Sequence, residues 1–247
     1  AKKLTHGSVA CVASSNGDNL TPMPRRILFT SQKGGVGKST LARSTAVALA
    51  YAGRRVLLAD FDVDQRTCMR WQAQRLARAL EPKVDVAAFS KEKKLGRVEF
   101  DYQDIVIDTR GQHDELSLDL ATSADVVFLP SSFSFDDVAP TLRVIESLRN
   151  AGVPSARVAI VFCRTGGSKK QAQQARSVLE MNRIAVLDAV LPQKDGFISL
   201  YATGRTGREA TQQKLRSVAL AMDEALLAFI ESASESVPKL VANGGSF

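Results

Sequence analysis

The segment ILFTSQKGGVGKSTLARSTAVALA, residues 27–50, decides the fold. A short apolar run typical of a buried strand leads into a glycine-rich turn, and a helix-forming stretch follows directly. Glycines let backbone N–H groups close around phosphate oxygens, and the positive end of a helix dipole favours the same anion. A strand, a glycine-rich turn and a helix in this order therefore predict a phosphate-binding loop.

The loop departs from the standard phosphate-loop motif at its first position. In G-x-x-x-x-G-K-[ST] a glycine would stand where this chain has Gln32, and a second lysine, Lys33, follows it. We expect Lys38 to reach the β- and γ-phosphates and the Ser39 hydroxyl to bind Mg²⁺. The other residues of the loop expected to bind the nucleotide phosphates are Gly34, Gly35, Val36, Gly37 and Thr40.

Two further apolar strands end in carboxylates, and P-loop enzymes use such a carboxylate as a second group for Mg²⁺. The stretch VLLADFDVDQ offers Asp60, Asp62 and Asp64, and the stretch DIVIDTRG offers Asp108. We assign Asp108 to the outer shell of Mg²⁺, because an apolar strand, an aspartate and a glycine turn form the Walker B arrangement. Asp62 is the first choice for positioning the attacking water or Mg²⁺. Asp60 is the second choice, and Asp64 is expected to be exposed.

Apolar runs alternate with helical segments along the rest of the chain. Strands are predicted at residues 26–30, 54–60, 104–108, 124–130, 157–163 and 185–192, and helices at residues 38–53, about 65–80, 136–152, 169–181 and about 209–232. Continuous apolar strands indicate a sheet that is buried on both faces. We therefore predict an α/β P-loop NTPase fold, a doubly wound and mostly parallel sheet with helices on both faces. One domain is expected at residues 26–235, between a flexible extension at 1–25 and a tail at 236–247.

Composition narrows the functional classes only moderately. The net charge of +7 is compatible with binding a polyanion, but proteins that bind none also carry such a charge. No apolar run has the length of a membrane span, and the N-terminal stretch lacks the apolar core of a signal peptide. Cys11, Cys68 and Cys163 are widely spaced, which argues against disulfides or a zinc site and favours a reducing cytoplasm. Cys163 and Trp71 are expected to be packing residues.

Several stretches together resemble the ParA/MinD family of deviant Walker ATPases: KGGVGKST, VLLADFD, DIVIDTRG, ADVVFLPSSFSFDDV and LPQKDGFISLYATGRTGREA, in this order. The resemblance implies that Lys33 is a signature lysine that crosses a dimer interface and contacts the phosphates of the partner's nucleotide. A cation supplied in this way neutralises charge that develops on the transferring phosphoryl group. With Lys38 and Asp62, Lys33 completes the predicted catalytic set.

Features absent from the sequence exclude several branches of that family. There is no suitable cysteine pair for the nitrogenase-like members, and the C-terminal stretch lacks the basic amphipathic helix of a membrane-attached MinD. The stretch before the first strand is too short for a helix-turn-helix domain. What remains resembles the small ParA partition proteins. The stretches DTRG and DFDVDQRTCMRW also resemble ParA-like virulence proteins that assist conjugative T-DNA transfer.

The resemblance implies a cytoplasmic, nucleoid-associated ATPase that requires ATP and Mg²⁺ and has weak basal activity. Its expected partners are a second copy in an ATP-dependent homodimer, nonspecific double-stranded DNA, and a ParB-like or other stimulating or cargo adaptor protein, with no membrane. An ATP-gated adaptor that recruits DNA or proteins to a conjugation or secretion machinery is the alternative.

Nonspecific DNA binding needs Lys and Arg contacts to phosphates and no base-reading groups. The candidates are Lys194, Arg205, Arg208, Lys169, Lys170, Lys214 and Arg216, with Arg164 nearby in the sequence. Arg205 is the first of these, because it follows Gly204 where the family often has a basic residue. Two departures from the family pattern leave the hydrolysis rate open: Val63 and Arg110 stand where prolines are usual, and Gln65 is displaced by one position.

Overall fold

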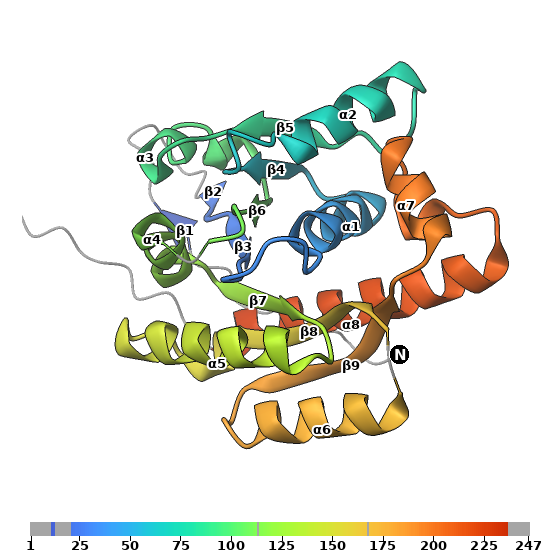
Figure 1. Cartoon of the computed structure of the whole chain (residues 1–247). Helices are drawn as coiled ribbons and strands as arrows, with labels where there is room; N and C mark the ends of the chain where they lie inside the picture. Colours follow the sequence, from blue (N-terminus) through green and yellow to red (C-terminus); the bar gives the residue numbers. More distant parts are fainter. Residues whose placement is uncertain (1–10, 13–20, 113, 167, 237–247) are drawn as a thin grey trace, which may run out of the picture.

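A sheet of seven parallel strands forms the centre of the protein (Figure 1). The structure is a computed structural model and describes residues 11–12, 21–112, 114–166 and 168–236. The strands, in spatial order, are β5 (Asp85–Ala88), β4 (Val56–Asp60), β6 (Asp104–Asp108), β3 (Arg25–Phe29), β7 (Val126–Ser131), β8 (Val158–Thr165) and β9 (Ala185–Pro192). A separate two-stranded pair joins β1 (Cys11–Val12) to β2 (Thr21–Pro22).

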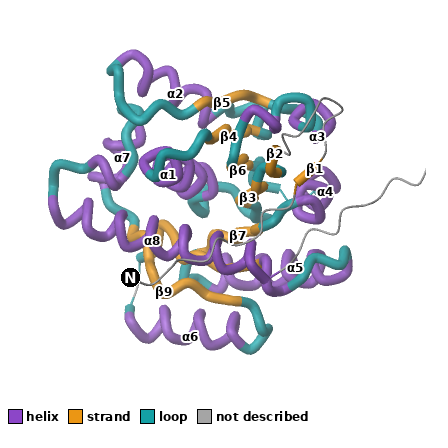
Figure 2. The backbone as a smooth tube through the Cα atoms, turned by 180° about the vertical axis from the view of Figure 1, so that it is seen from behind, coloured by secondary structure: helices purple, strands orange, loops and turns teal. Residues whose placement is uncertain are grey.

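Helices cover both faces of the sheet (Figures 1 and 2). One face packs against α1 (Lys38–Tyr51), α2 (Thr67–Ala77), α7 (Asp195–Ala202) and α8 (Gln213–Ser236). The other face packs against α3 (Glu92–Leu95), α4 (Glu115–Ser123), α5 (Phe135–Asn150) and α6 (Lys169–Glu180). Short 3₁₀ turns occur at η1 (Glu99–Asp101), η2 (Ser155–Arg157) and η3 (Gly207–Glu209).

The two faces explain why the strands are continuously apolar. Successive side chains of a strand point to opposite faces. In β3, Ile27 and Phe29 belong to the core under α1, whereas Leu28 belongs to the core on the opposite face. Strands β4, β6 and β7 are buried at every position, so the predicted doubly wound α/β fold is confirmed, with a sheet that is parallel throughout.

The structure adds elements that the sequence pattern did not predict, namely β5, α3, α4 and α7. The last helix begins at Gln213 instead of the predicted residue 209, because Thr206 and Glu209 form a capping box around a 3₁₀ turn. Gly53 and Gly152 lie just beyond the ends of α1 and α5 with φ of 77° and 79°, the left-handed conformation expected of helix-ending glycines.

The predicted division of the chain into extension, domain and tail stays a prediction, since residues 1–10, 13–20 and 237–247 lie outside the described residues. Among the described helices, none is both long and apolar enough to cross a membrane.

Strands β4, β5 and β6 lie on one side of β3, and β7, β8 and β9 lie on its other side, so the order of the strands reverses between β3 and β7. The connection after β3 leads through α1 to β4, and the connection after β7 leads through α5 to β8 on the opposite side. Ligands of open α/β sheets bind beyond the carboxyl ends of the strands at such a reversal. The glycine-rich turn follows β3 at this place.

Candidate functional site

The glycine-rich turn between β3 and α1 has a backbone that requires glycine. Gly35 and Gly37 have φ of 79° and 106°, a region that side chains disfavour. A Cβ atom at Gly37 would also lie 2.3 Å from the Sγ atom of Cys163 at the end of β8. Cys163 is fully buried, as predicted, and the turn packs directly on it.

Lys38 occupies the inside of this turn. Its side chain is buried, and its Nζ donates to the Ser31 Oγ at 3.0 Å and to the Lys33 carbonyl at 3.3 Å. Burial lowers the pKa of Lys38, while the charges of Asp108 and Asp62 act in the opposite direction. The ammonium group therefore lies within the loop, at the place where a phosphate-binding turn brings its ligand.

Two carboxylates stand at the ends of neighbouring strands beside the turn. Asp108 of β6 is in register with Phe29 of β3 on one side and with Asp60 of β4 on the other. Both carboxylates are fully buried. Burial raises the pKa of Asp60 to about 6, and the neighbouring Asp108 adds to the rise. Burial also raises the pKa of Asp108, against the effects of the Ser39 hydroxyl, the Cys68 thiol, Lys38 and Arg43.

The residues at this place fit a magnesium ion. The Oδ2 atom of Asp108 accepts from the Cys68 thiol at 3.2 Å, but its Oδ1 atom is buried without a hydrogen-bond partner. The Ser39 hydroxyl lies beside the same carboxylate. Among the described residues, no group of three or more His, Cys, Asp or Glu could hold a metal alone. Mg²⁺ is usually bound by one or two protein oxygens together with phosphate oxygens and water, and the Asp108 carboxylate and the Ser39 hydroxyl are such oxygens.

The aspartates after β4 differ in their surroundings. Asp62 is half-buried, and its Oδ1 accepts the backbone N–H of Gln65 at 3.0 Å. Its own N–H donates to Asp60 at 3.0 Å, so the turn is anchored on the buried carboxylate. Asp64 is exposed, as expected. The role of Asp62 in positioning water or Mg²⁺ stays a prediction.

The side chain of Lys33 contacts helix α5 of the same chain. Its side chain is 49% exposed, and its Nζ forms an ion pair of 2.5 Å with Asp137 in the first turn of α5. The Ser132 hydroxyl donates to the other oxygen of Asp137 at 2.5 Å. The hydrogen bond and the charge of Asp137 raise the pKa of Lys33, so the residue stays charged. The contact of Lys33 with a partner's nucleotide stays a prediction.

Three contacts with the turn come from residues that sequence reasoning missed or assigned elsewhere. Arg43 of α1 donates to the Ser39 carbonyl at 2.6 Å, and Arg164 of β8 donates to the Gly35 carbonyl at 2.7 Å. The backbone of Gly111 approaches so closely that a Cβ there would lie 2.6 Å from the Cα of Gly34. No motif marks Arg164, because strand order brings it to the turn, whereas Gly111 ends the stretch DIVIDTRG and Arg43 lies only four residues from Ser39.

The profile of the CobQ/CobB/MinD/ParA nucleotide binding domain matches residues 27–206 of the chain. The chain belongs to this family. The match begins in β3 and ends just before η3, and it includes the turn and both strand-end carboxylates.

Individual members of the ParA/MinD family show similarity over most of the chain. Protein virC1 of Rhizobium radiobacter is 25% identical over 226 residues, which cover 81% of this chain and 94% of the relative. The chromosome partitioning protein ParA of Caulobacter vibrioides is 26% identical over 217 residues, which cover 69% of this chain and 81% of ParA. These relatives agree with the resemblance to ParA-type ATPases that the sequence motifs indicate.

Solved structures of family members share the fold. The septum site-determining protein MinD of Pyrococcus horikoshii, complexed with Mg-ADP, gives a TM-score of 0.65 at 20% identity, over 83% of this chain and 98% of that chain. A plasmid partition protein of Borrelia burgdorferi bound to AMPPNP gives a TM-score of 0.62 at 16% identity, over 83% of this chain and 99% of that chain. The likeness supports the ParA/MinD fold of the sheet and its helices.

The basic residues predicted to contact DNA divide into two groups in this ParA/MinD-type fold. Arg208 is engaged within the protein: its Nε donates to Asp223 at 2.9 Å, and its guanidinium lies 4.8 Å from the ring centre of Tyr51. The others are exposed or half-exposed, namely Lys169 and Lys170 at the start of α6, Lys194 just before α7, Arg205 after α7, and Lys214 and Arg216 at the start of α8. Their contact with DNA stays a prediction.

Proposed function

We propose that the chain is a Mg²⁺-dependent ATPase of the ParA type. In this proposal ATP closes a dimer that binds double-stranded DNA without sequence preference and positions a plasmid, a chromosome or another cargo. A ParB-like or other adaptor protein stimulates slow hydrolysis, and the protein works in the cytoplasm over the nucleoid. The observation that carries the proposal is the buried Lys38 inside a glycine turn beside the unmatched oxygen of Asp108.

Each residue has a defined part in this scheme. Lys38 neutralises the β- and γ-phosphates, and Ser39 and Asp108 hold Mg²⁺ in its inner and outer shell. Bound Mg²⁺ supplies positive charge to the phosphate oxygens. Asp62 orients the attacking water. Lys33 leaves Asp137 and stabilises the charge on the partner's nucleotide, as a cation delivered across an interface does.

Substitution of the two lysines separates binding from dimerisation. We expect Lys38→Ala to abolish ATP binding, measured by isothermal titration calorimetry, because the buried cation is lost. Lys33→Ala should retain ATP affinity but lose the ATP-dependent dimer, measured by light scattering after gel filtration, and lower hydrolysis. Lys93→Ala, an exposed lysine on α3, is the matched control. If Lys33→Ala changes neither dimerisation nor hydrolysis, its role across the interface is wrong.

A second candidate function is an ATP-gated adaptor that recruits DNA or proteins to a conjugation or secretion machinery. The resemblance of DTRG and DFDVDQRTCMRW to ParA-like virulence proteins favours it, and the two relatives named virC1 match 81% and 72% of this chain. Gel shifts with scrambled and cognate DNA, with and without ATP, distinguish the two functions. ATP-dependent binding to any duplex that weakens steeply with salt supports the partition function. Binding that requires one sequence or ignores ATP supports the adaptor.

A further inference from the structure

Helix α2 begins at the two strand-end carboxylates. The backbone N–H groups of Cys68 and Met69 donate to the Oδ2 atom of Asp60 at 3.0 and 3.4 Å. The Cys68 thiol, which is fully buried, donates to the Oδ2 atom of Asp108 at 3.2 Å. A single residue of α2 therefore holds both carboxylates, one with its backbone and the other with its side chain.

The thiol contact decides which oxygen of Asp108 is left for a ligand. With Oδ2 bonded to Cys68, the buried Oδ1 atom is the one without a partner. Hydrogen bonds of this kind orient the carboxylates around a metal, and their loss typically weakens metal binding 10- to 100-fold. The position of Cys68 is thus that of an orienting donor.

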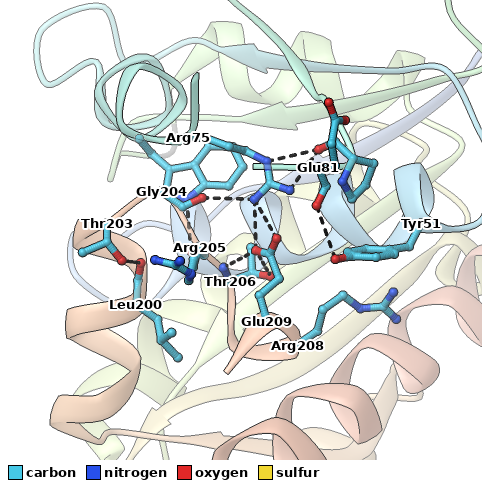
Figure 3. Close-up of polar contacts among 12 residues, drawn as sticks. Tyr51, Arg75, Glu81, Leu200, Thr203, Gly204, Arg205, Thr206, Arg208 and Glu209 are labelled. Carbon is cyan, nitrogen blue, oxygen red and sulfur yellow. Dashed lines mark hydrogen bonds and ion pairs between the residues drawn. The ribbon is translucent and has the colours of Figure 1, made fainter. Parts of the chain in front are cut away.

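Side chains of α2 form hydrogen bonds with residues 204–209, here called the Arg205 segment (Figure 3). The side chain of Arg75 is 2% exposed, pairs with both oxygens of Glu209 at 2.9 and 3.0 Å, and donates to the Gly204 carbonyl at 3.1 Å. The indole N–H of Trp71 donates to the Arg205 carbonyl at 3.1 Å. Gly204 lies so close that a Cβ there would be 2.4 Å from the Arg75 backbone N.

We propose that Cys68 is a positioning residue of the nucleotide site, and that through α2 it ties the docking of the Arg205 segment to the occupancy of that site. The proposal rests on the proposed ATPase function. A helix of 11 residues moves as one body, so a shift of Cys68 displaces Trp71 and Arg75 with it. Because such coupling is reciprocal, a ligand that contacts the Arg205 segment would in turn change the affinity for the metal-bound nucleotide.

The chain contains its own reporter for this coupling. Trp71 is its only tryptophan, and it contacts the Arg205 segment directly. We expect the emission of Trp71 to differ between ATP with Mg²⁺ and ATP with EDTA. In Cys68→Ala the Mg²⁺ concentration that gives half of this change should rise about 10-fold or more, because the donor to Asp108 is lost. Cys68→Ser, whose hydroxyl donates in place of the thiol, should restore it.

Two controls make the outcomes distinct. Arg70→Ala changes an exposed residue of the same helix and should behave as the wild type does. Binding of a fluorescent ATP analogue, measured in parallel, tests the proposed function by itself, and its absence in the wild type overturns both proposals. Analogue binding with an unchanged Mg²⁺ dependence in a folded Cys68→Ala variant overturns the positioning role alone.

The coupling is also testable without any variant. In the wild type, we expect slower amide hydrogen exchange across residues 200–209 with ATP and Mg²⁺ than with ATP and EDTA. If Trp71 emission and this exchange are both the same in the two conditions while the analogue binds, the link through α2 is overturned.

Discussion

Strand β6 has an aspartate at each end, and the two aspartates differ in their hydrogen-bond partners. Asp104 and Asp108 begin and end this strand of five residues, and both are fully buried. Asp104 accepts from the Arg25 guanidinium at 2.7 Å and from that of Arg54. Asp108 accepts from a thiol and keeps one oxygen unmatched. Buried polar groups are normally satisfied, so the unpartnered oxygen beside the glycine-rich turn supports the proposed ligand site.

The contrast extends to the neighbouring strands. At the amino ends, Arg26 pairs with Glu92 and Glu99, each at 2.6 Å, so acidic side chains meet guanidinium groups there. At the carboxyl ends, Asp60 and Asp108 lie side by side, and the charge of Asp108 adds to the rise that burial causes in the pKa of Asp60. At one end of the sheet a buried carboxylate pairs with guanidinium groups, whereas at the other end a buried carboxylate oxygen has no hydrogen-bond partner.

The largest effect on stability is expected from Asp104→Asn. The substitution takes the charge away from two guanidiniums that share one buried carboxylate. We expect the free energy of unfolding to fall by roughly 3 kcal/mol, the low end for breaking a buried pair, because both arginines reach solvent. Urea unfolding measures this change. The ATP affinity of the folded variant should equal that of the wild type. A folded variant that has lost ATP affinity would show that Asp104 does more than stabilise the fold.

Asp108→Asn should lower ATP hydrolysis without lowering the free energy of unfolding. A neutral side chain of the same shape removes a buried charge, so the free energy of unfolding should stay equal or rise. ATP hydrolysis should fall about 100-fold, which is typical for the loss of one preorganised charged group in a site. Urea unfolding and a phosphate-release assay measure the two quantities, with Asp119→Asn on the exposed side of α4 as the control. A marked loss of stability without loss of hydrolysis would make Asp108 structural like Asp104.

The smallest effect concerns Asp223 of α8, a buried carboxylate outside both ends of the sheet. Burial raises its pKa to about 7, the pair with Arg208 opposes the rise, and Glu209 and Glu224 add to it. A raised carboxyl pKa stabilises the folded state fully below the unfolded pKa of about 3.9, and this stabilisation is lost as pH rises through about 7.

Comparison of the wild type with Asp223→Asn tests this sign. From pH 5 to pH 8 we expect the unfolding temperature of the wild type to fall by roughly 5–10 °C relative to the variant, because the two pH units below a pKa of about 7 correspond to about 2.7 kcal/mol. Differential scanning calorimetry measures it. Parallel curves over this range would show that Asp223 is already charged at pH 5.

The sequence by itself determined the features that depend on local backbone. Gly35 and Gly37 are the residues that a left-handed turn requires, so the stretch KGGVGKST specified the loop, and continuous apolar runs specified a sheet buried on both faces. The short strand β5 and the helix α7 were not predicted, because β5 has only four residues and α7 only eight.

The Walker B pattern already assigned Asp108 of DIVID to the site, but only the tertiary structure shows which groups neutralise Asp104 and which contact Asp108. Both end the same apolar run and are equally buried. The difference comes from partners far away in the chain: Arg25 is 79 residues from Asp104, and Cys68 is 40 residues from Asp108. Strand order brings these partners together, and the electrostatic state of a buried group depends on neighbours in space, which no local pattern records.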